Sequence, residues 1–169
     1  DEGAPCRSIS VLSPTGLGRR EPPGPRFGDR VNAVTGTPVL GKALYRLLTS
    51  GPSVRWFLNQ AFAGRAPTEL VDYALATARM PGARYAPFAF LSMALFSRAA
   101  LEGLYARVQQ PLLLLYDEDP NVTFERLPEL LARNTAVTAQ RIAGTHGMPH
   151  WERPEATLQA LRAFWGELD

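Results

Sequence analysis

Four consecutive leucines, Leu112–Leu115, constrain the fold of this chain more than any other feature of its sequence. They form the centre of an apolar run between Gln110 and Tyr116 in which polar and apolar residues do not alternate. Such a run is typical of a parallel strand that is buried on both faces. Because parallel strands are joined by long crossover connections, usually helices, the sequence predicts an α/β domain.

Two further segments are predicted as strands. Arg7–Leu12 is a short apolar run closed by Pro and Gly, and Ala136–Ile142 is a weaker one. A helix is predicted from Thr123, after the leucine-rich strand, and a second amphipathic helix over Pro154–Leu168. The last helix is expected to turn four apolar side chains inward, those of Leu158, Leu161, Phe164 and Trp165. Strands that alternate with helices predict one parallel sheet with right-handed crossovers.

Composition and pattern divide the chain into four segments. Residues 1–18 hold the first strand and its loop. Residues 19–38 are rich in Pro, Gly and Arg without periodicity, which predicts a loop, either a connector or a cover over a substrate entrance. Residues 39–108 carry apolar residues at helical spacing with no strand between them, which predicts a block of short helices. Residues 109–169 contain the second and third strands and their helices.

Acidic and histidine side chains follow two of the predicted strands. Tyr116-Asp-Glu-Asp119-Pro120 comes directly after the second strand, and Gly144–His150 follows the third. Since ligands of open parallel sheets bind outside the carboxyl ends of the strands, Asp119 and His146 are expected to meet there. An acid and a histidine are two members of a nucleophile–His–acid triad. In such a triad the carboxylate orients the imidazole, which acts as general base and acid.

These motifs resemble the C-terminal third of α/β-hydrolases of the lidded esterase, epoxide-hydrolase and dehalogenase-like type. That family carries its acid in a Gly-x-x-Asp-Pro-like turn and its histidine in a Gly-His-x-Pro-His-x-Glu-x-Pro-Glu-like segment. The matching segment here is Gly144-Thr-His-Gly-Met-Pro-His-Trp-Glu-Arg-Pro-Glu155. The resemblance implies a partial α/β-hydrolase fold, with three parallel strands, flanking helices, and residues 39–108 as an inserted helical lid. It also implies that Asp119 is the triad acid, which precedes the histidine as in this fold.

The sequence departs from the family pattern at two positions. Tyr116 replaces the glycine of the acid turn, a change that such a turn tolerates. Gly147 stands where the family's histidine belongs, and His146 lies one position earlier. Either the loop absorbs this shift and His146 still reaches Asp119, or the histidine was lost and this branch uses different chemistry. His150 is expected to be a structural residue.

The sequence also lacks several motifs. It contains no Gly-x-Ser-x-Gly nucleophile elbow. The nucleophile is therefore expected before Asp1, in a missing N-terminal half of the same protein, and the chain alone is expected to be inactive. No Gly-rich phosphate loop is present, so no cofactor is predicted. No metal site is predicted either, because the two histidines lie in a Gly/Pro loop and not on a helix. Asp117 and Glu118 are expected to be solvated turn charges.

The composition argues against several kinds of partner. The formal net charge is +2 and the basic residues are scattered, which disfavours nucleic-acid binding. Cys6 is the only cysteine, so an internal disulfide is impossible and a reducing, cytoplasmic location is expected. No apolar run reaches the roughly 18 residues that a membrane span needs, so no membrane contact is predicted.

Three functions remain open at this stage. The first is a hydrolase that cleaves an ester or similar bond in a small apolar substrate, present here as a fragment without its nucleophile. The second is a non-catalytic α/β-hydrolase-like protein that binds a small molecule or a partner, which the displaced histidine favours. The third is a small free-standing α/β binding domain.

Overall fold

The structure is a computed structural model, and it describes residues 6–168. The chain forms two compact units. The core unit comprises the residues up to Arg20, Ala61–Ala63, and the residues from Arg98 onward. The helical unit comprises Glu21–Gln60 and Gly64–Ser97. Within residues 6–168, no helix is long and apolar enough to cross a lipid bilayer.

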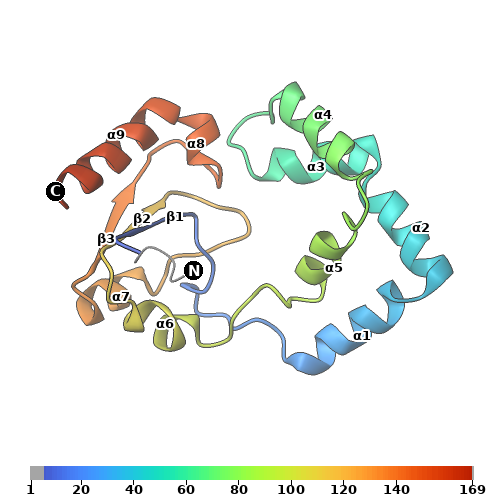
Figure 1. Cartoon of the computed structure of the whole chain (residues 1–169), viewed down its shortest axis with the longest axis horizontal. Helices are drawn as coiled ribbons and strands as arrows, with labels where there is room; N and C mark the ends of the chain where they lie inside the picture. Colours follow the sequence, from blue (N-terminus) through green and yellow to red (C-terminus); the bar gives the residue numbers. More distant parts are fainter. Residues whose placement is uncertain (1–5, 169) are drawn as a thin grey trace. The chain divides into compact units, whose positions relative to one another are not determined.

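The core unit is built on a parallel sheet of three strands in the order β1-β2-β3 (Figure 1). These are β1 (Ile9–Leu12), β2 (Leu112–Tyr116) and β3 (Val137–Arg141). The leucine run occupies the central strand, and Leu112–Leu115 are all at most 4 % exposed. A strand between two neighbours, covered on both faces, has no position for a polar side chain, which is why the run is continuous. The predicted parallel sheet is confirmed.

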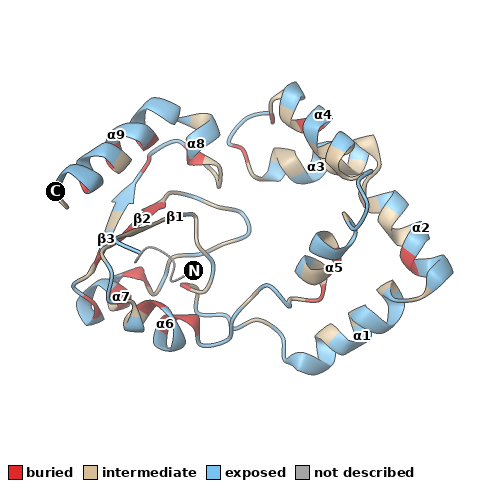
Figure 2. Ribbon diagram, viewed as in Figure 1, coloured by how far each residue is buried: buried red, intermediate tan, exposed pale blue. Residues whose placement is uncertain are grey.

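Helices cover both faces of this sheet (Figure 2). On one face, Leu112 and Leu114 pack against buried residues of α6 (Ala100–Gly103), the 3-10 turn η1 (Tyr105–Arg107) and α7 (Leu127–Arg133). On the other face, Leu113 and Leu115 pack against Ala160 and Phe164 of α9 (Pro154–Gly166). Successive residues of a strand point to opposite faces, so the run supplies both layers of the core.

The packing of this unit corrects two details of the sequence prediction. The helix expected from Thr123 begins at Leu127. In the segment before it, the Thr123 hydroxyl donates to the Glu125 carboxylate. In α9, Phe164 is buried and Leu161 is partly buried, whereas Leu158 and Trp165 are 43 % and 46 % exposed. The buried stripe of α9 is instead completed by the small residues Thr157 and Ala160.

The helical unit contains five helices among the described residues. They are α1 (Pro25–Thr35), α2 (Pro38–Leu48), α3 (Gly51–Gln60), α4 (Thr68–Thr77) and α5 (Tyr85–Leu91). Helix α1 packs against α2 and α5, and α3 packs against α4. Unlike the core unit, this unit buries few large side chains, chiefly those of Val71 and Phe88.

Two boundaries of the predicted segments are wrong. Residues 19–38 were expected to be a loop, but α1 occupies Pro25–Thr35. Its proline is at the first turn, where proline is favourable, and Phe27, Val31 and Val34 follow at helical spacing. The predicted helical block 39–108 also ends too late, because α6 and η1 belong to the core unit.

Candidate functional site

The carboxylate of Asp119 lies just beyond the carboxyl end of β2, three residues after Tyr116, and two donors hold it there. The Ser13 hydroxyl, directly after β1, donates to Asp119 Oδ2 over 2.5 Å. The backbone N–H of Asn121 donates to Oδ1 over 2.7 Å. Both oxygens are thus oriented, and the carboxylate is partly buried. Adjacent parallel strands end at the same edge of the sheet, which explains how residues 106 positions apart meet.

Ser13 adopts an unusual backbone conformation at this point. Its φ of +43° lies in the left-handed region, which costs a non-glycine residue roughly 1–3 kcal/mol and is concentrated at functional sites. Its N–H still extends the sheet ladder by bonding the Leu115 carbonyl over 2.9 Å. The turn therefore directs the hydroxyl toward Asp119. Ser13 was not predicted as a site residue, because its partner Asp119 lies 106 positions away along the chain.

Gly147 lies directly against the Asp119 carboxylate. A β-carbon at Gly147 would be 2.8 Å from Asp119 Oδ2 and 3.4 Å from its Cγ, closer than a side chain normally approaches. The carboxylate therefore occupies the space that a side chain at position 147 would enter. This is the position at which the resemblance places the family's histidine, and the glycine there lets the carboxylate approach the loop backbone.

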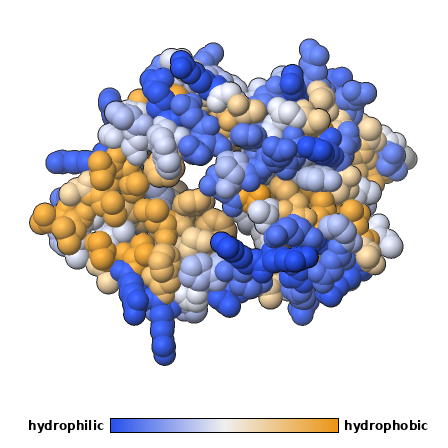
Figure 3. All heavy atoms as spheres, turned by 180° about the vertical axis from the view of Figure 1, so that it is seen from behind, coloured by the Kyte–Doolittle hydropathy of each residue, from blue (hydrophilic) through white to orange (hydrophobic). Residues whose placement is uncertain are grey.

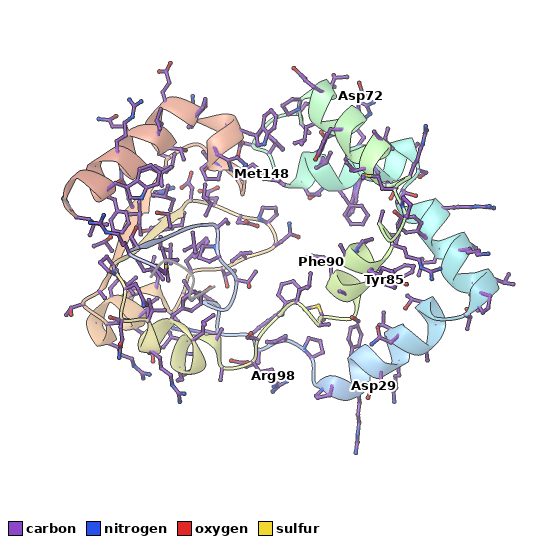
Figure 4. The ribbon with its side chains drawn as sticks, viewed as in Figure 1. Asp29, Asp72, Tyr85, Phe90, Arg98 and Met148 are labelled. Atoms are coloured by element: carbon purple, nitrogen blue, oxygen red, sulfur yellow. The ribbon has the colours of Figure 1, made fainter. Side chains whose placement is uncertain are left out.

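His146 precedes this glycine and is held through its backbone. Its N–H donates to Glu152 Oε2 over 2.8 Å, while its side chain is partly buried. His150 is exposed on α8 (Pro149–Glu152). Met148, the N-cap residue just before that helix, is labelled in Figure 4. Within residues 6–168, neither imidazole forms a hydrogen bond with Asp119. The structure thus brings Asp119 to the histidine loop at Gly147, without joining it to an imidazole.

Asp117 is not a solvated turn charge, which corrects the sequence expectation. Its side chain is 3 % exposed and forms an ion pair with Arg141, and its Oδ2 accepts the N–H of Thr145 over 3.0 Å. Burial raises the pKa of this carboxyl, but hydrogen bonds from Thr145, Arg141 and Gly144 together hold the pKa below its usual value. Asp117 therefore fixes the start of the histidine loop to the end of β2. Glu118, by contrast, is 77 % exposed.

No cluster of metal-ligating side chains accompanies these groups in the described chain. Across residues 6–168, no three His, Cys, Asp or Glu side chains come close enough together to hold a metal ion. The acidic residues of the site face backbone N–H groups, the Ser13 hydroxyl and Arg141. The arrangement can therefore orient a loop and accept a proton or a hydrogen bond.

The helical unit contains an apolar pocket of about 740 Å³. Residues of α2, α3, α4 and α5 and of the turn at Met80–Ala83 line it, and none of them is charged. Its three hydroxyls all donate to backbone carbonyls: Tyr45 to Ala78, Thr49 to Tyr45, and Thr77 to Tyr73 and Ala74.

Apolar side chains gather over the helical unit on the face shown in Figure 3. Figure 4 labels Phe90, which belongs to the pocket lining. With no charge and no free hydroxyl in its lining, the pocket suits an uncharged apolar group.

No protein-family model matches the sequence, and no curated protein matches it. Solved structures do match in fold. Cfl2 from Burkholderia cenocepacia aligns over 94 % of this chain and 56 % of its own, with 22 % identity and a TM-score of 0.65. A putative aryl esterase from the same species aligns over 74 % and 47 %, with 20 % identity and a TM-score of 0.53. The haloalkane dehalogenase DatA from Agrobacterium tumefaciens aligns over 96 % and 55 %, with 18 % identity and a TM-score of 0.56. The chain spans about half the length of the structures that it matches.

Proposed function

We propose that this chain, which has the α/β-hydrolase fold over about half of that fold's length, supplies the acid and the histidine of a nucleophile–His–acid triad. The position of Asp119 carries the proposal. Its carboxylate lies at the carboxyl end of the central strand, is oriented by Ser13 and Asn121, and faces the loop that contains His146. In such a triad the carboxylate holds the imidazole in the productive tautomer, and the imidazole moves the proton between nucleophile and leaving group.

The one-residue offset of the histidine sets a condition on this mechanism. An imidazole that enters from position 146 competes with the Ser13 hydroxyl for Oδ2 or shares that oxygen with it. Gly147 places no side chain of its own between the two groups. In the proposed active state, His146 therefore donates to Asp119 after a local change of its side chain, and its backbone stays bonded to Glu152.

The proposed substrate is a small apolar ester or a compound with a similar cleavable bond. The uncharged pocket of the helical unit supports this class. So do the activities named for three solved proteins with the same fold, a putative aryl esterase, a haloalkane dehalogenase and a 2-hydroxy-6-oxo-6-phenylhexa-2,4-dienoate hydrolase. In the proposed mechanism, the nucleophile and the oxyanion-hole donors come from outside these 169 residues, which contain no Gly-x-Ser-x-Gly segment. We place this activity in the cytoplasm.

The test compares this chain with a longer protein that joins it to the remaining part of the fold. The longer protein should hydrolyse a short-chain 4-nitrophenyl ester, and the 169 residues alone should not. Asp119→Asn and His146→Ala should each lower kcat by about 10³–10⁴-fold. Exposed residues of the same types serve as matched controls, and Glu118→Gln and His150→Ala should leave kcat unchanged. Full activity of both site variants would refute the triad.

A second candidate is a non-catalytic protein that binds an apolar small molecule. It is favoured by the occupation of Asp119 Oδ2 by Ser13 and by the glycine at position 147. In that case the longer protein would be folded but inert toward the ester. An uncharged aromatic ligand would still stabilise it against urea, and Ala74→Phe, which fills the pocket of the helical unit, would remove that stabilisation.

A further inference from the structure

Glu152 lies at the end of α8, and each oxygen of its carboxylate accepts a hydrogen bond from a backbone N–H group. Oε2 accepts the N–H of His146 over 2.8 Å, and Oε1 accepts the N–H of Ala63 over 2.7 Å. The two donors lie 6 and 89 positions away along the chain. Hydrogen bonds from N–H groups to a carboxylate are short and about twice as strong as neutral ones. Within residues 6–168, Glu152 forms no ion pair. The two backbone N–H groups are therefore the donors that stabilise its carboxylate.

The segment Ala61–Ala63 is joined to α3 and α4 by the chain, yet it packs within the core unit. Phe62 is 5 % exposed. The carbonyl oxygen of Ala61 lies 3.7 Å from the point where a β-carbon of Gly147 would stand. The segment therefore approaches the histidine loop at two places, beside Gly147 through Ala61 and at Glu152 through Ala63.

We propose that Glu152 is a positioning residue that ties the backbone of His146 to the segment joining α3 to α4. A displacement of Ala61–Ala63 then reaches His146 through one carboxylate, because the same side chain holds both N–H groups. Asp117 fixes the preceding residue, Thr145, from the sheet side. The importance of this link for catalysis rests on the proposed role of His146, while the link itself does not.

The chemistry of the two bonds supplies the test. A glutamine at position 152 has one acceptor oxygen and an NH₂ group, so Glu152→Gln must lose one bond and set two donors face to face. In the 169-residue chain, amide hydrogen exchange followed by NMR should become about tenfold faster at both Ala63 and His146. Exchange at Leu113–Leu115 should not change. The control is Glu155→Gln, an exposed carboxylate three residues later, which should alter neither amide.

Ala63→Pro tests the link from its other end. Proline removes the N–H donor, and the Ala63 side chain is exposed, so the substitution itself disturbs little packing. Exchange at His146 should again become faster, although His146 is untouched. The control is Gly64→Ala, whose β-carbon would meet open space. Unchanged exchange at His146 in Ala63→Pro, or a change at only one of the two amides in Glu152→Gln, would overturn the link.

The same variants separate this inference from the proposed function. In the longer protein, Glu152→Gln should lower kcat more than it raises KM, and Glu152→Asp, which keeps both acceptor oxygens, should restore part of kcat. If Glu152→Gln speeds amide exchange at Ala63 and His146 but His146→Ala leaves kcat unchanged, the link stands and the triad fails. If His146→Ala abolishes turnover but Glu152→Gln does not change amide exchange at His146, the triad stands and the link fails.

Discussion

At the scale of single residues, the candidate site depends on the glycine at position 147, which has no side chain. Gly147 allows the Asp119 carboxylate to lie against the loop backbone, and any β-carbon there would come within 2.8 Å of an oxygen that Ser13 also holds. The residue before it, His146, carries the imidazole that a triad needs. The site thus contains an oriented carboxylate, and under the proposed function the imidazole of His146 must reach it by a local rearrangement.

The substitution Gly147→Ala tests this close approach. The new methyl group must push the carboxylate away from Ser13, so we expect a loss of about 1–3 kcal/mol in the free energy of unfolding, as for other overpacked sites. Urea denaturation measures it. Gly64→Ala is the matched control, because its β-carbon would meet nothing within 4 Å; it should be neutral or add up to about 1 kcal/mol. Equal stability of the two variants would mean that the carboxylate is free to move.

Asp117 gives a prediction about pH. Its pKa is below the ordinary 3.8, so the folded state favours the charged form. The stabilisation is complete above about pH 4 and is lost as the pH falls through the lower folded pKa. Asp117→Asn should therefore cost about 1–3 kcal/mol at pH 7, and the difference from the wild type should narrow below pH 4. Urea titrations at several pH values measure the loss at pH 7 and its decrease below pH 4.

Glu118→Gln is the control for the Asp117 prediction. Its carboxylate is 77 % exposed and lies 3.9 Å from the guanidinium of Arg141, a contact that is worth little at the surface. We expect a change within about 0.5 kcal/mol at every pH. A loss in Asp117→Asn that stays constant down to pH 2 would show that the shape of the side chain matters and its charge does not.

The sequence was informative about some of these residues and silent about others, for a physical reason. Asp119 and His146 follow predicted strands within recognisable turns, so local pattern was enough to select them. Ser13 and Glu152 act through bonds that span 106 and 89 positions. A single sequence carries no sign of such pairings, because they depend on which strand ends and segments become neighbours. The burial of Asp117 could not be predicted for the same reason, since its partner Arg141 lies on the neighbouring strand β3.

At the scale of secondary structure, the prediction succeeded where one physical force dominated. The leucine run of β2 must be buried on both faces, and this predicted a strand of a parallel sheet. Helix α1 was missed because its Pro and Gly residues suggested a loop, although Phe27, Val31 and Val34 have helical spacing. The tertiary contacts of α1 with α2 and α5 stabilise a segment whose local preference is weak.

The corner between α1 and α2 depends on Gly41. A β-carbon there would lie 2.1 Å from the carbonyl oxygen of Thr35 at the end of α1. Because that atom belongs to the backbone, Gly41→Ala must separate the two helices. We expect a loss of about 1–3 kcal/mol from overpacking, minus up to about 1 kcal/mol from the better helix propensity of alanine. Far-UV circular dichroism during urea denaturation measures the net change.

Gly51→Ala is the control within the same unit. Gly51 begins α3, and its β-carbon would meet nothing within 4 Å, so alanine should be neutral or stabilising. If Gly41→Ala were as stable as Gly51→Ala, the close packing of α1 on α2 would be wrong, and the earlier expectation of a loop over residues 19–38 would regain support.

At the scale of the whole molecule, the two units differ in how they are stabilised. Both hydrophobic core clusters, on the two faces of the sheet, belong to the core unit. In the helical unit, many large apolar side chains are exposed, including Val39 at 77 % and Leu47 at 67 %. Burial of apolar surface is the main source of folding free energy, at about 25 cal/mol per Å². The free energy of unfolding of each unit should therefore increase with the apolar surface that the unit buries.

This difference predicts that the helical unit unfolds first. In the 169-residue chain, amides of α2 and α4 should exchange at least about tenfold faster than those of β2 and α7, which corresponds to about 1.4 kcal/mol less protection. Urea should remove helical signal in a first step and the sheet in a second, as expected for two units of unequal stability. Hydrogen exchange resolved by residue measures the order. A single transition in which α2 and β2 lose protection at the same urea concentration would contradict it, and would mean that the two units fold as one cooperative body.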